Sequence, residues 1–433
     1  MQGTRQWHNG VIYGLFSLIS LGLLFFVWRF GVNIPWGDEW DALLFINKTG
    51  TSGLDFRALF AQHNEHRIAV PRLIMLANTT LFSFNLKYQM YLTATGLIAV
   101  SLICFYRFTG VVSPGFRWLA LIAPLLICSF RQSENLLWGF QIGLVLSLLL
   151  PVIAFHILAG SKQCEPGPYW IVAALLSGLL GSFSSSQGLF FWPCAVLLTA
   201  LSGERNKWPA ALLAGAGIIV WGLYFSGYVK PAGHPTISYI MEHPYEGFRF
   251  FCMTLGNLVA WREDVSFAAG FLFLAAFIAA LAAATAKKRL VELRFWIALG
   301  LFSLMVLFAI TLGRAGSGID AAFASRYTTF SAVFAVSLLA ILAALSTTGS
   351  MPGFRILLIP VTLLLLVAAP FSYLQGWNSG KFMHGEFTRL SFLLKNYRMV
   401  PAQSLQYLYI PNPQVVKERA PFLEKLGHEI FSR

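Results

Sequence analysis

Residues 11–41 read VIYGLFSLISLGLLFFVWRFGVNIPWGDEWD, an apolar run followed directly by a cluster of carboxylates. A helix needs about 20 mostly apolar residues to cross the hydrocarbon core of a bilayer. This run is too long for the core of a signal peptide, and no A-x-A-like cleavage site follows it. We therefore predict a first membrane span that places Asp38, Glu39 and Asp41 at the membrane surface.

The composition of the rest of the chain extends this pattern. Of the 433 residues, 57% are hydrophobic and only 11% are charged, whereas soluble domains carry about 25% charged residues. Long apolar runs recur throughout, and helices satisfy their own backbone hydrogen bonds in lipid. The sequence therefore predicts an all-α integral membrane protein.

The net charge and the cysteines exclude other classes. The net charge is +13, but the basic residues stand in short loops between apolar runs, where membrane topology and lipid head groups explain them. No nucleic-acid partner is therefore expected. No CxxC pair occurs, so neither a disulfide framework nor a zinc site is expected. The five cysteines are Cys104, Cys128, Cys164, Cys194 and Cys252.

Hydropathy predicts about eleven transmembrane helices. The third and the sixth are short, which favours tilted or re-entrant packing. The segment 67–84 is apolar but contains Arg67, Pro71, Arg72 and Asn78, and we expect it to lie along the interface. The eleven predicted helices cover residues 9–30, 88–106, 118–130, 139–158, 169–186, 189–202, 209–227, 266–285, 295–312, 328–346 and 355–373.

Loop charge then predicts the orientation. With 67–84 at the interface, one set of short loops collects most of the basic residues, which marks the cytoplasmic side. The prediction is an integral protein of a bacterial inner (plasma) membrane, with the N-terminus in the cytoplasm and the C-terminus outside. The basic residues of that set are Arg5, Arg107, Arg117, Lys162, Arg205, Lys207, Lys287, Lys288, Arg289, Arg294 and Arg355.

The same orientation separates the acidic residues. All but Glu165, Glu204 and Glu292 of the 18 acidic residues fall outside, although acids contribute little to membrane orientation. Chemistry or ligand binding on the outer face would explain this, and a solvated surface is the alternative. We expect a polytopic domain over residues 1–374, with a first outer loop at 31–87 and interfacial helices in it. Residues 375–433 are expected to form a small outer cap.

The carboxylates after the first span are the first candidate site. On a helix, Asp38 and Asp41 share a face, and flanking tryptophans anchor at membrane interfaces. The pair is suited to act as a base or to bind a divalent cation such as Mg²⁺ or Mn²⁺. The alternative is mechanical, with Asp38 as an N-cap and Asp41 completing a capping box.

Further polar groups occur in the other outer loops. On a helix, His63, His66 and Arg67 would share a face near Glu65, with an exposed interfacial helix as the alternative. Arginine pairs well with phosphate oxygens, and polar residues near membrane depth are often functional. Helix-end snorkelling is the alternative for Arg326. The candidate substrate-binding residues are His63, Glu65, His66, Arg67, Arg131, Glu134, Arg314, Arg326 and Tyr327.

These features together resemble the GT-C class of membrane glycosyltransferases. The specific part of the resemblance is Asp38-Glu39-Trp40-Asp41, and more loosely His63–Arg67 and Ser325-Arg326-Tyr327. The resemblance implies a polyprenyl-phosphate-sugar donor and a glycan or lipid acceptor of the cell envelope, as in O-antigen or wall modification. It makes Asp38 the general base, with Glu39 and Asp41 as rivals, and implies inversion at the anomeric carbon. A divalent cation is used by some members but is not required by this sequence.

Two other functions compete with the transferase. A polysaccharide polymerase or ligase is also fed by lipid-linked sugar, but such proteins usually place their large outer loop late in the chain. A transporter or flippase would carry charges within its helices and show paired halves. Here the helix interiors are almost free of charge and the longest internal outer loop comes first, so we favour the transferase.

Overall fold

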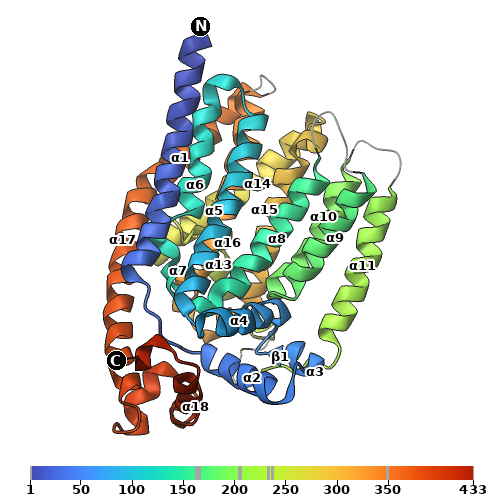
Figure 1. Ribbon diagram of the computed structural model, residues 1–433. Helices are drawn as coiled ribbons and strands as arrows, with labels where there is room; N and C mark the ends of the chain where they lie inside the picture. The colour runs from blue at the N-terminus through green and yellow to red at the C-terminus, as the bar shows by residue number, and fades with distance from the viewer. Residues whose placement is uncertain are drawn as a thin grey trace.

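A computed structural model describes residues 2–160, 167–202, 207–231, 235, 238–347 and 351–432, and gives the side chains of residues 2–9 no placement. Lys162, Cys164, Glu165, Glu204 and Arg205 lie outside the described residues, as does the side chain of Arg5. The described chain is a bundle of helices with one hairpin, whose two strands have two residues each (Figure 1). The predicted all-α membrane fold is confirmed.

Each of the eleven predicted spans coincides with a helical segment. Among the described residues, nine helical segments are long and apolar enough to cross a membrane. The predicted fifth and sixth spans are shorter, α9 (Pro168–Ser182) and α10 (Phe191–Ala200). The other spans are built on α1 (Gln2–Phe30), α5 (Leu86–Val111), α6 (Ile122–Ile127), α8 (Ile142–Leu158), α11 (Trp208–Phe225), α14 (Glu263–Ala286), α15 (Leu290–Arg314), α16 (Thr328–Thr347) and α17 (Arg355–Lys395).

Helix α16 forms the centre of the bundle. Its apolar window is buried inside the protein over its whole length, one of the two positions, with a membrane span, that suit a helix that is apolar all round. By contrast, the apolar window of α1 is mostly exposed, as expected of a helix that faces lipid. The site described below therefore rests on a rigid central helix.

The span around α6 is broken rather than continuous. It consists of the short helices η1 (Pro114–Leu121), α6, η2 (Phe130–Gln132) and α7 (Ser133–Leu137). Non-helical backbone at membrane depth is tolerated where protein covers it, and here the polar side chains Arg131, Gln132 and Asn135 are all buried. The break brings polar groups into the bundle near its loop end.

Helices α13 (Pro244–Gly256) and α14 pack with their backbones in close contact. A Cβ atom added to Gly270 would lie 1.8 Å from the carbonyl oxygen of Cys252, and one added to Gly256 would lie 2.0 Å from that of Ser266. Only glycine allows this approach, which is typical of helix pairs in membranes.

One end of the bundle gathers the first loop and the C-terminal tail, opposite the N-terminus (Figure 1). The first loop contains α2 (Glu39–Ser52), α3 (Phe56–Leu59), strands β1 (Gln62–His63) and β2 (His66–Arg67), and α4 (Ala69–Phe82). The segment predicted to lie at the interface is thus the 14-residue helix α4, too short to cross a bilayer.

The tail folds back onto the first loop. Helix α17 continues without a break to Lys395, so the predicted boundary at residue 374 falls inside it. The indole Nε1 of Trp36 donates to the carbonyl of Tyr407 at 2.8 Å, and His428 Nε2 lies 3.0 Å from Asn33 Oδ1. The tail contains η9 (Ala402–Leu408), α18 (Gln414–Lys425) and η10 (Glu429–Phe431).

The remaining elements connect the spans. They are η3 (Gly139–Gln141), η4 (Ser186–Phe190), α12 (Ser238–Glu242), η5 (Ala315–Ser317), η6 (Ile319–Phe323), η7 (Ser325–Tyr327) and η8 (Pro352–Phe354). Of these, η3, η4 and η7 supply residues to the cavity described next.

Candidate functional site

A cavity of about 280 Å³ lies at the loop end of the bundle. Helix ends and loops from distant parts of the chain line it, and the lining includes both polar and apolar side chains. Six of the residues predicted from sequence line it: Asp38, Glu65, His66, Arg314, Arg326 and Tyr327. The cavity thus combines two carboxylates, two arginines and a histidine.

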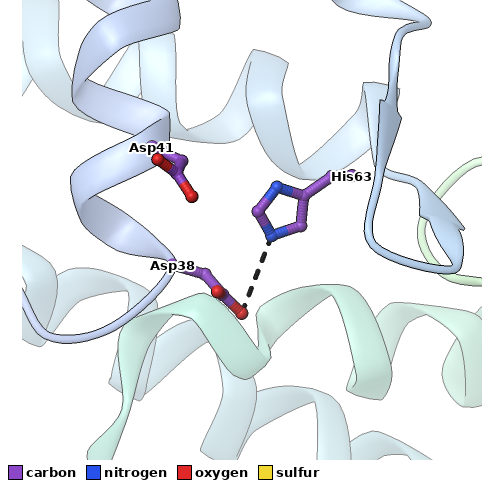
Figure 2. A group of neighbouring side chains, drawn as sticks. All are labelled: Asp38, Asp41 and His63. Carbon is purple, nitrogen blue, oxygen red and sulfur yellow. Dashed lines mark ion pairs between the residues drawn. The ribbon is translucent and has the colours of Figure 1, made fainter. Parts of the chain in front are cut away.

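Asp38 stands at the start of α2, where it faces His63 of the hairpin. The carboxylate Oδ2 lies 3.6 Å from His63 Nε2 (Figure 2). Its side chain makes no hydrogen bond to the helix that it precedes, so the capping box considered from sequence is not formed. Asp38 is therefore available to groups in the cavity.

Asp41 lies close to Asp38 but its carboxylate has protein partners. Arg419 Nη1 donates to Asp41 Oδ1 at 2.9 Å, and the Tyr409 hydroxyl lies 3.1 Å from both carboxylate oxygens. Burial, followed by the negative charge of Asp41, raises the pKa of Tyr409 to about 12, so this hydroxyl stays a donor. Asp41 does not line the cavity.

Glu39 points away from the cavity into the protein. Its side chain is 1% exposed, and its Oε2 accepts a hydrogen bond from the backbone N–H of Trp36 at 2.8 Å. Burial raises the pKa of this carboxyl to about 8. Glu39 is thus a buried group that holds the loop before α2, and it has no path to a substrate in the cavity.

Residues 62–67 form a β-hairpin, so the predicted helical face of His63, His66 and Arg67 was wrong. His63 and His66 are partners across the two strands, with the turn at Asn64 and Glu65. Asn64 adopts φ 49°, a left-handed conformation that asparagine tolerates better than most residues. Strand alternation, rather than helical spacing, therefore decides where these side chains point.

The hairpin contacts the end of α15 and the helix η4 at the cavity. Glu65 Oε1 forms an ion pair with Arg314 Nη1 at 2.8 Å, and His66 Nδ1 lies 2.8 Å from Ser186 Oγ. Burial alone would raise the pKa of Glu65, but Arg314 and His66 lower it below its usual value. Burial lowers the pKa of His66 to about 4, so this imidazole is neutral at pH 7.

Arg67 is a structural residue in this fold. Its guanidinium donates to three backbone carbonyls, those of Tyr224 at 2.6 Å, Phe60 at 2.7 Å and Ser226 at 2.5 Å. These bonds fix the hairpin against the end of α11. The structure therefore separates Arg67 from the cavity that sequence reasoning assigned it to.

Arg326 lines the cavity, and its guanidinium is paired with Glu134, which is not among the lining residues. Arg326 Nη1 lies 2.9 Å from Glu134 Oε1, and Glu134 also accepts from the hydroxyl of Ser325 at 2.9 Å. The guanidinium lies 5.1 Å from the ring centre of Tyr327, a cation–π contact. This arrangement holds Arg326 at the cavity edge.

A second, more open cavity of about 530 Å³ lies on the other side of this ion pair. Glu134 and Ser325 line it on the bundle side, and α17 lines it on the outside. The α17 residues Phe371, Leu374 and Phe382 are exposed. Arg326 lines the first cavity and Glu134 lines the second, so their ion pair lies between the two cavities. The second cavity borders exposed apolar residues of α17.

Arg131 lines neither cavity. Its guanidinium donates to Gln375 Oε1 at 2.5 Å and to the carbonyl of Asn257 at 2.9 Å, and lies 4.1 Å from the ring centre of Trp261. It is 2% exposed. Arg131 therefore ties the broken span to α13 and α17 rather than meeting a substrate.

Sequence reasoning missed part of the site. No candidate was named in the polar stretch at residues 181–188, whereas Ser184, Ser185, Ser186 and Gln187 line the cavity. Arg419 and Tyr409 had no local signal at all, because nothing in a mixed tail indicates which loop it will cover.

A metal ion was considered for the first-loop carboxylates. Asp38, Asp41 and His63 each offer one ligand atom within 4.8 Å of the others, so their spacing alone fits a cation. Both oxygens of Asp41, however, already accept from Arg419 and Tyr409. The donor set available without breaking those contacts is Asp38 and His63, which is too small for a dedicated site.

No family model matches the sequence, and no curated protein matches it. Among solved structures, the Archaeoglobus fulgidus oligosaccharyltransferase, in complex with zinc and sulfate, is similar with 14% identity and a TM-score of 0.42. The similarity covers 85% of this chain and 53% of the oligosaccharyltransferase, so the chain spans about half of that protein. ArnT from Cupriavidus metallidurans, bound to undecaprenyl phosphate, is similar with 11% identity and a TM-score of 0.47, over 96% of this chain and 88% of ArnT. The chain itself is an all-α membrane protein with a cavity at one end of its bundle, lined by polar and charged side chains.

Proposed function

We propose that this protein transfers a sugar from a polyprenyl-phosphate-linked donor to a hydroxyl of a cell-envelope glycan or lipid. The observation that supports this most is the content of one cavity, in which Asp38 stands with Arg314 and Arg326. Such a cavity at the end of a membrane bundle offers a base and cationic groups to a substrate whose lipid stays in the bilayer.

In the proposed reaction Asp38 is the general base. Its carboxylate takes the proton of the acceptor hydroxyl while that oxygen attacks the anomeric carbon of the donor sugar. A new glycosidic bond forms, and the bond from the anomeric carbon to the phosphate oxygen breaks, with its electron pair leaving on the phosphate. One displacement inverts the configuration. Proton transfer of this kind contributes about 10²–10⁴-fold to the rate.

The arginines would stabilise the leaving phosphate. Negative charge grows on the phosphate oxygens as the sugar departs, and fixed cationic donors lower the energy of that transition state. Arg314 and Arg326 are each held by a carboxylate, Glu65 and Glu134. They are thus pre-positioned, and the planar guanidinium group matches phosphate oxygens with paired hydrogen bonds.

The two cavities would accommodate different parts of the donor. Arg326 lines the inner cavity, and its partner Glu134 lines the outer one. A phosphate at Arg326 would place the sugar inward, toward Asp38, and the isoprenoid chain outward, along the exposed apolar residues of α17. Membrane lipids would occupy the same face of α17 when no donor is bound.

The proposed orientation puts the first loop and tail on the outer side of a bacterial inner membrane, with the N-terminus in the cytoplasm. Figure 1 bears on this, because the N-terminus lies at the end of the bundle opposite the first loop and the tail. Positive charge in the short loops of the N-terminal side favours the cytoplasm for that end.

The test is Asp38→Asn in the full-length protein. The variant keeps the shape of the side chain but removes the base, and we expect sugar transfer from a polyprenyl-phosphate-sugar to fall at least about 100-fold. Asp55→Asn is the matched control, because Asp55 caps α3 in the same loop and lies outside the cavity. Equal activity in Asp38→Asn and Asp55→Asn would overturn the assignment of the base.

A further inference from the structure

Arg419 comes from the C-terminal tail, yet its guanidinium reaches the acidic first turn of α2. Nη1 lies 2.9 Å from Asp41 Oδ1 and 2.5 Å from the carbonyl oxygen of Trp40. We infer that Arg419 is a built-in cation that balances Asp41 and excludes a divalent metal ion from the group formed by Asp38, Asp41 and His63. The exclusion of a metal ion does not depend on the proposed function. Its consequence for catalysis rests on the proposed role of Asp38 as the base.

The guanidinium is fixed in place by the packing of the tail. Arg419 belongs to α18, whose residues Val416, Ala420 and Leu423 are fully buried. The Arg419 side chain itself is 19% exposed, and its second bond to the carbonyl of Trp40 orients it. A held arginine loses less conformational entropy on pairing than a free surface side chain would.

A metal ion bridging Asp41 would lie very near this charge. Ligand oxygens of Mg²⁺ stand about 2.0–2.1 Å from the ion, so a cation on Asp41 Oδ1 would be no more than about 5 Å from Arg419 Nη1. A divalent and a monovalent cation at that separation repel each other strongly in a half-buried site. The hydroxyl of Tyr409, which donates to the same carboxylate, adds to the competition.

The two aspartates therefore have different partners and different roles in the site. Arg419 and Tyr409 occupy Asp41 from the tail side, whereas Asp38 faces the cavity and His63. The tail thereby supplies the positive charge that a metal would otherwise bring to the cluster. The carboxylate of Asp38 is left without a metal partner and open to an acceptor hydroxyl. Arg419 acts here as a positioning residue, because it meets the site only through Asp41.

Metal binding can be measured without any transfer reaction. Purified full-length protein in detergent is titrated with Mn²⁺ alone, and free Mn²⁺ is followed by electron paramagnetic resonance. We expect no saturable Mn²⁺ binding at this group in the wild type. Arg419→Gln removes the competing charge and is expected to gain saturable Mn²⁺ binding at this group. Adding Asp41→Asn to that variant should abolish the gain.

Two controls separate charge from tail docking. Arg398 follows α17 and forms an ion pair with Glu424 of α18, with Nη2 and Oε2 2.6 Å apart. This pair does not involve Asp41, so Arg398→Gln should bind Mn²⁺ as the wild type does. Arg419→Lys keeps the positive charge and should also behave as the wild type. Equal Mn²⁺ affinity in Arg419→Gln and Arg398→Gln, or in Arg419→Gln and Arg419→Lys, would overturn the inference.

One test of the inference needs no substitution at Arg419. Saturable Mn²⁺ binding by wild-type protein that Asp41→Asn removes would overturn the inference even if Arg419→Gln does not fold. Where transfer is active, wild-type activity should persist in excess EDTA. Loss of transfer in Asp38→Asn concerns the proposed function, whereas the Mn²⁺ titration concerns Arg419, so the two can fail separately.

Discussion

Arg314 at the end of α15 forms an ion pair with Glu65 in the hairpin of the first loop, with Nη1 and Oε1 2.8 Å apart. The pair joins opposite halves of the chain at one face of the bundle. The transfer proposed above requires such a contact, because the proposed base Asp38 follows the first span and the arginines precede the last spans. The ion pair shows that the first loop and the loop after α15 meet at one end of the bundle.

The first prediction concerns Arg314. Arg314→Gln should lower transfer about 10- to 100-fold, because it removes a cation that binds the donor phosphate and stabilises its charge as the sugar departs. Arg314→Lys should retain more activity, since lysine binds phosphate as a point charge. Steady-state kinetics with varied donor concentration measure the effect as a rise in KM for the donor.

The control for Arg314 is Arg249→Gln. Arg249 forms an ion pair with Glu263 outside the cavity, so its loss should leave the donor KM unchanged. A donor KM for Arg314→Gln within twofold of the wild-type value would speak against phosphate binding by Arg314.

The second prediction links Glu39 to the pH dependence of stability. The pKa of this buried carboxyl is about 8 in the folded protein against 4.5 ordinarily, so the folded state holds the proton more tightly. Stability contributed by the protonated form is complete below about pH 4.5 and is lost as the pH rises toward 8. The limit is about 1.4 kcal/mol for each pH unit in this window.

Glu39→Gln removes this titration while keeping an oxygen for the N–H of Trp36. The melting temperature of the wild type should fall between pH 5.5 and 8.5 more steeply than that of Glu39→Gln, as thermal unfolding in detergent would show. Glu246→Gln, at an exposed position of α13, should follow the wild type. Parallel pH profiles of the wild type and Glu39→Gln would refute the prediction.

The third prediction separates a structural arginine from a substrate-binding one. Arg131→Met leaves Gln375 Oε1 and the carbonyl of Asn257 without their donor, and unpaired buried acceptors cost about 1–3 kcal/mol each. The folded yield and the melting temperature should fall. Transfer per mole of folded protein should stay within about twofold of the wild type. A much larger loss would indicate that Arg131 binds the substrate after all.

The fourth prediction tests the close contact of α13 and α14. Gly270→Ala would place a methyl group 1.8 Å from the carbonyl oxygen of Cys252, so the helices must move apart. Overpacking of this kind costs about 1–3 kcal/mol or more. Gly222→Ala in α11 has open space around it and should be neutral. Equal melting temperatures for the two variants would contradict the packing.

The sequence predicted the helices well because hydropathy is local. A run such as residues 11–30 must cross or be buried whatever follows it, and every predicted span has a helix. The hairpin at 62–67 was missed because its six residues fit a helical face as well as a strand pair, and a tertiary contact decides between them. That contact is the set of bonds from Arg67 to the carbonyls around α11.

Residue type and position after the first span determined that Asp38, Glu39 and Asp41 are candidates, and loop order determined that arginines would join them. Only the tertiary structure decided that Asp38 faces the cavity and that Glu39 is buried. It also decided that Asp41 is paired with Arg419 and Tyr409. The physical reason is that the availability of a carboxylate depends on which distant groups come within about 3 Å of it. Such proximity results from how the whole chain packs, which local sequence does not encode.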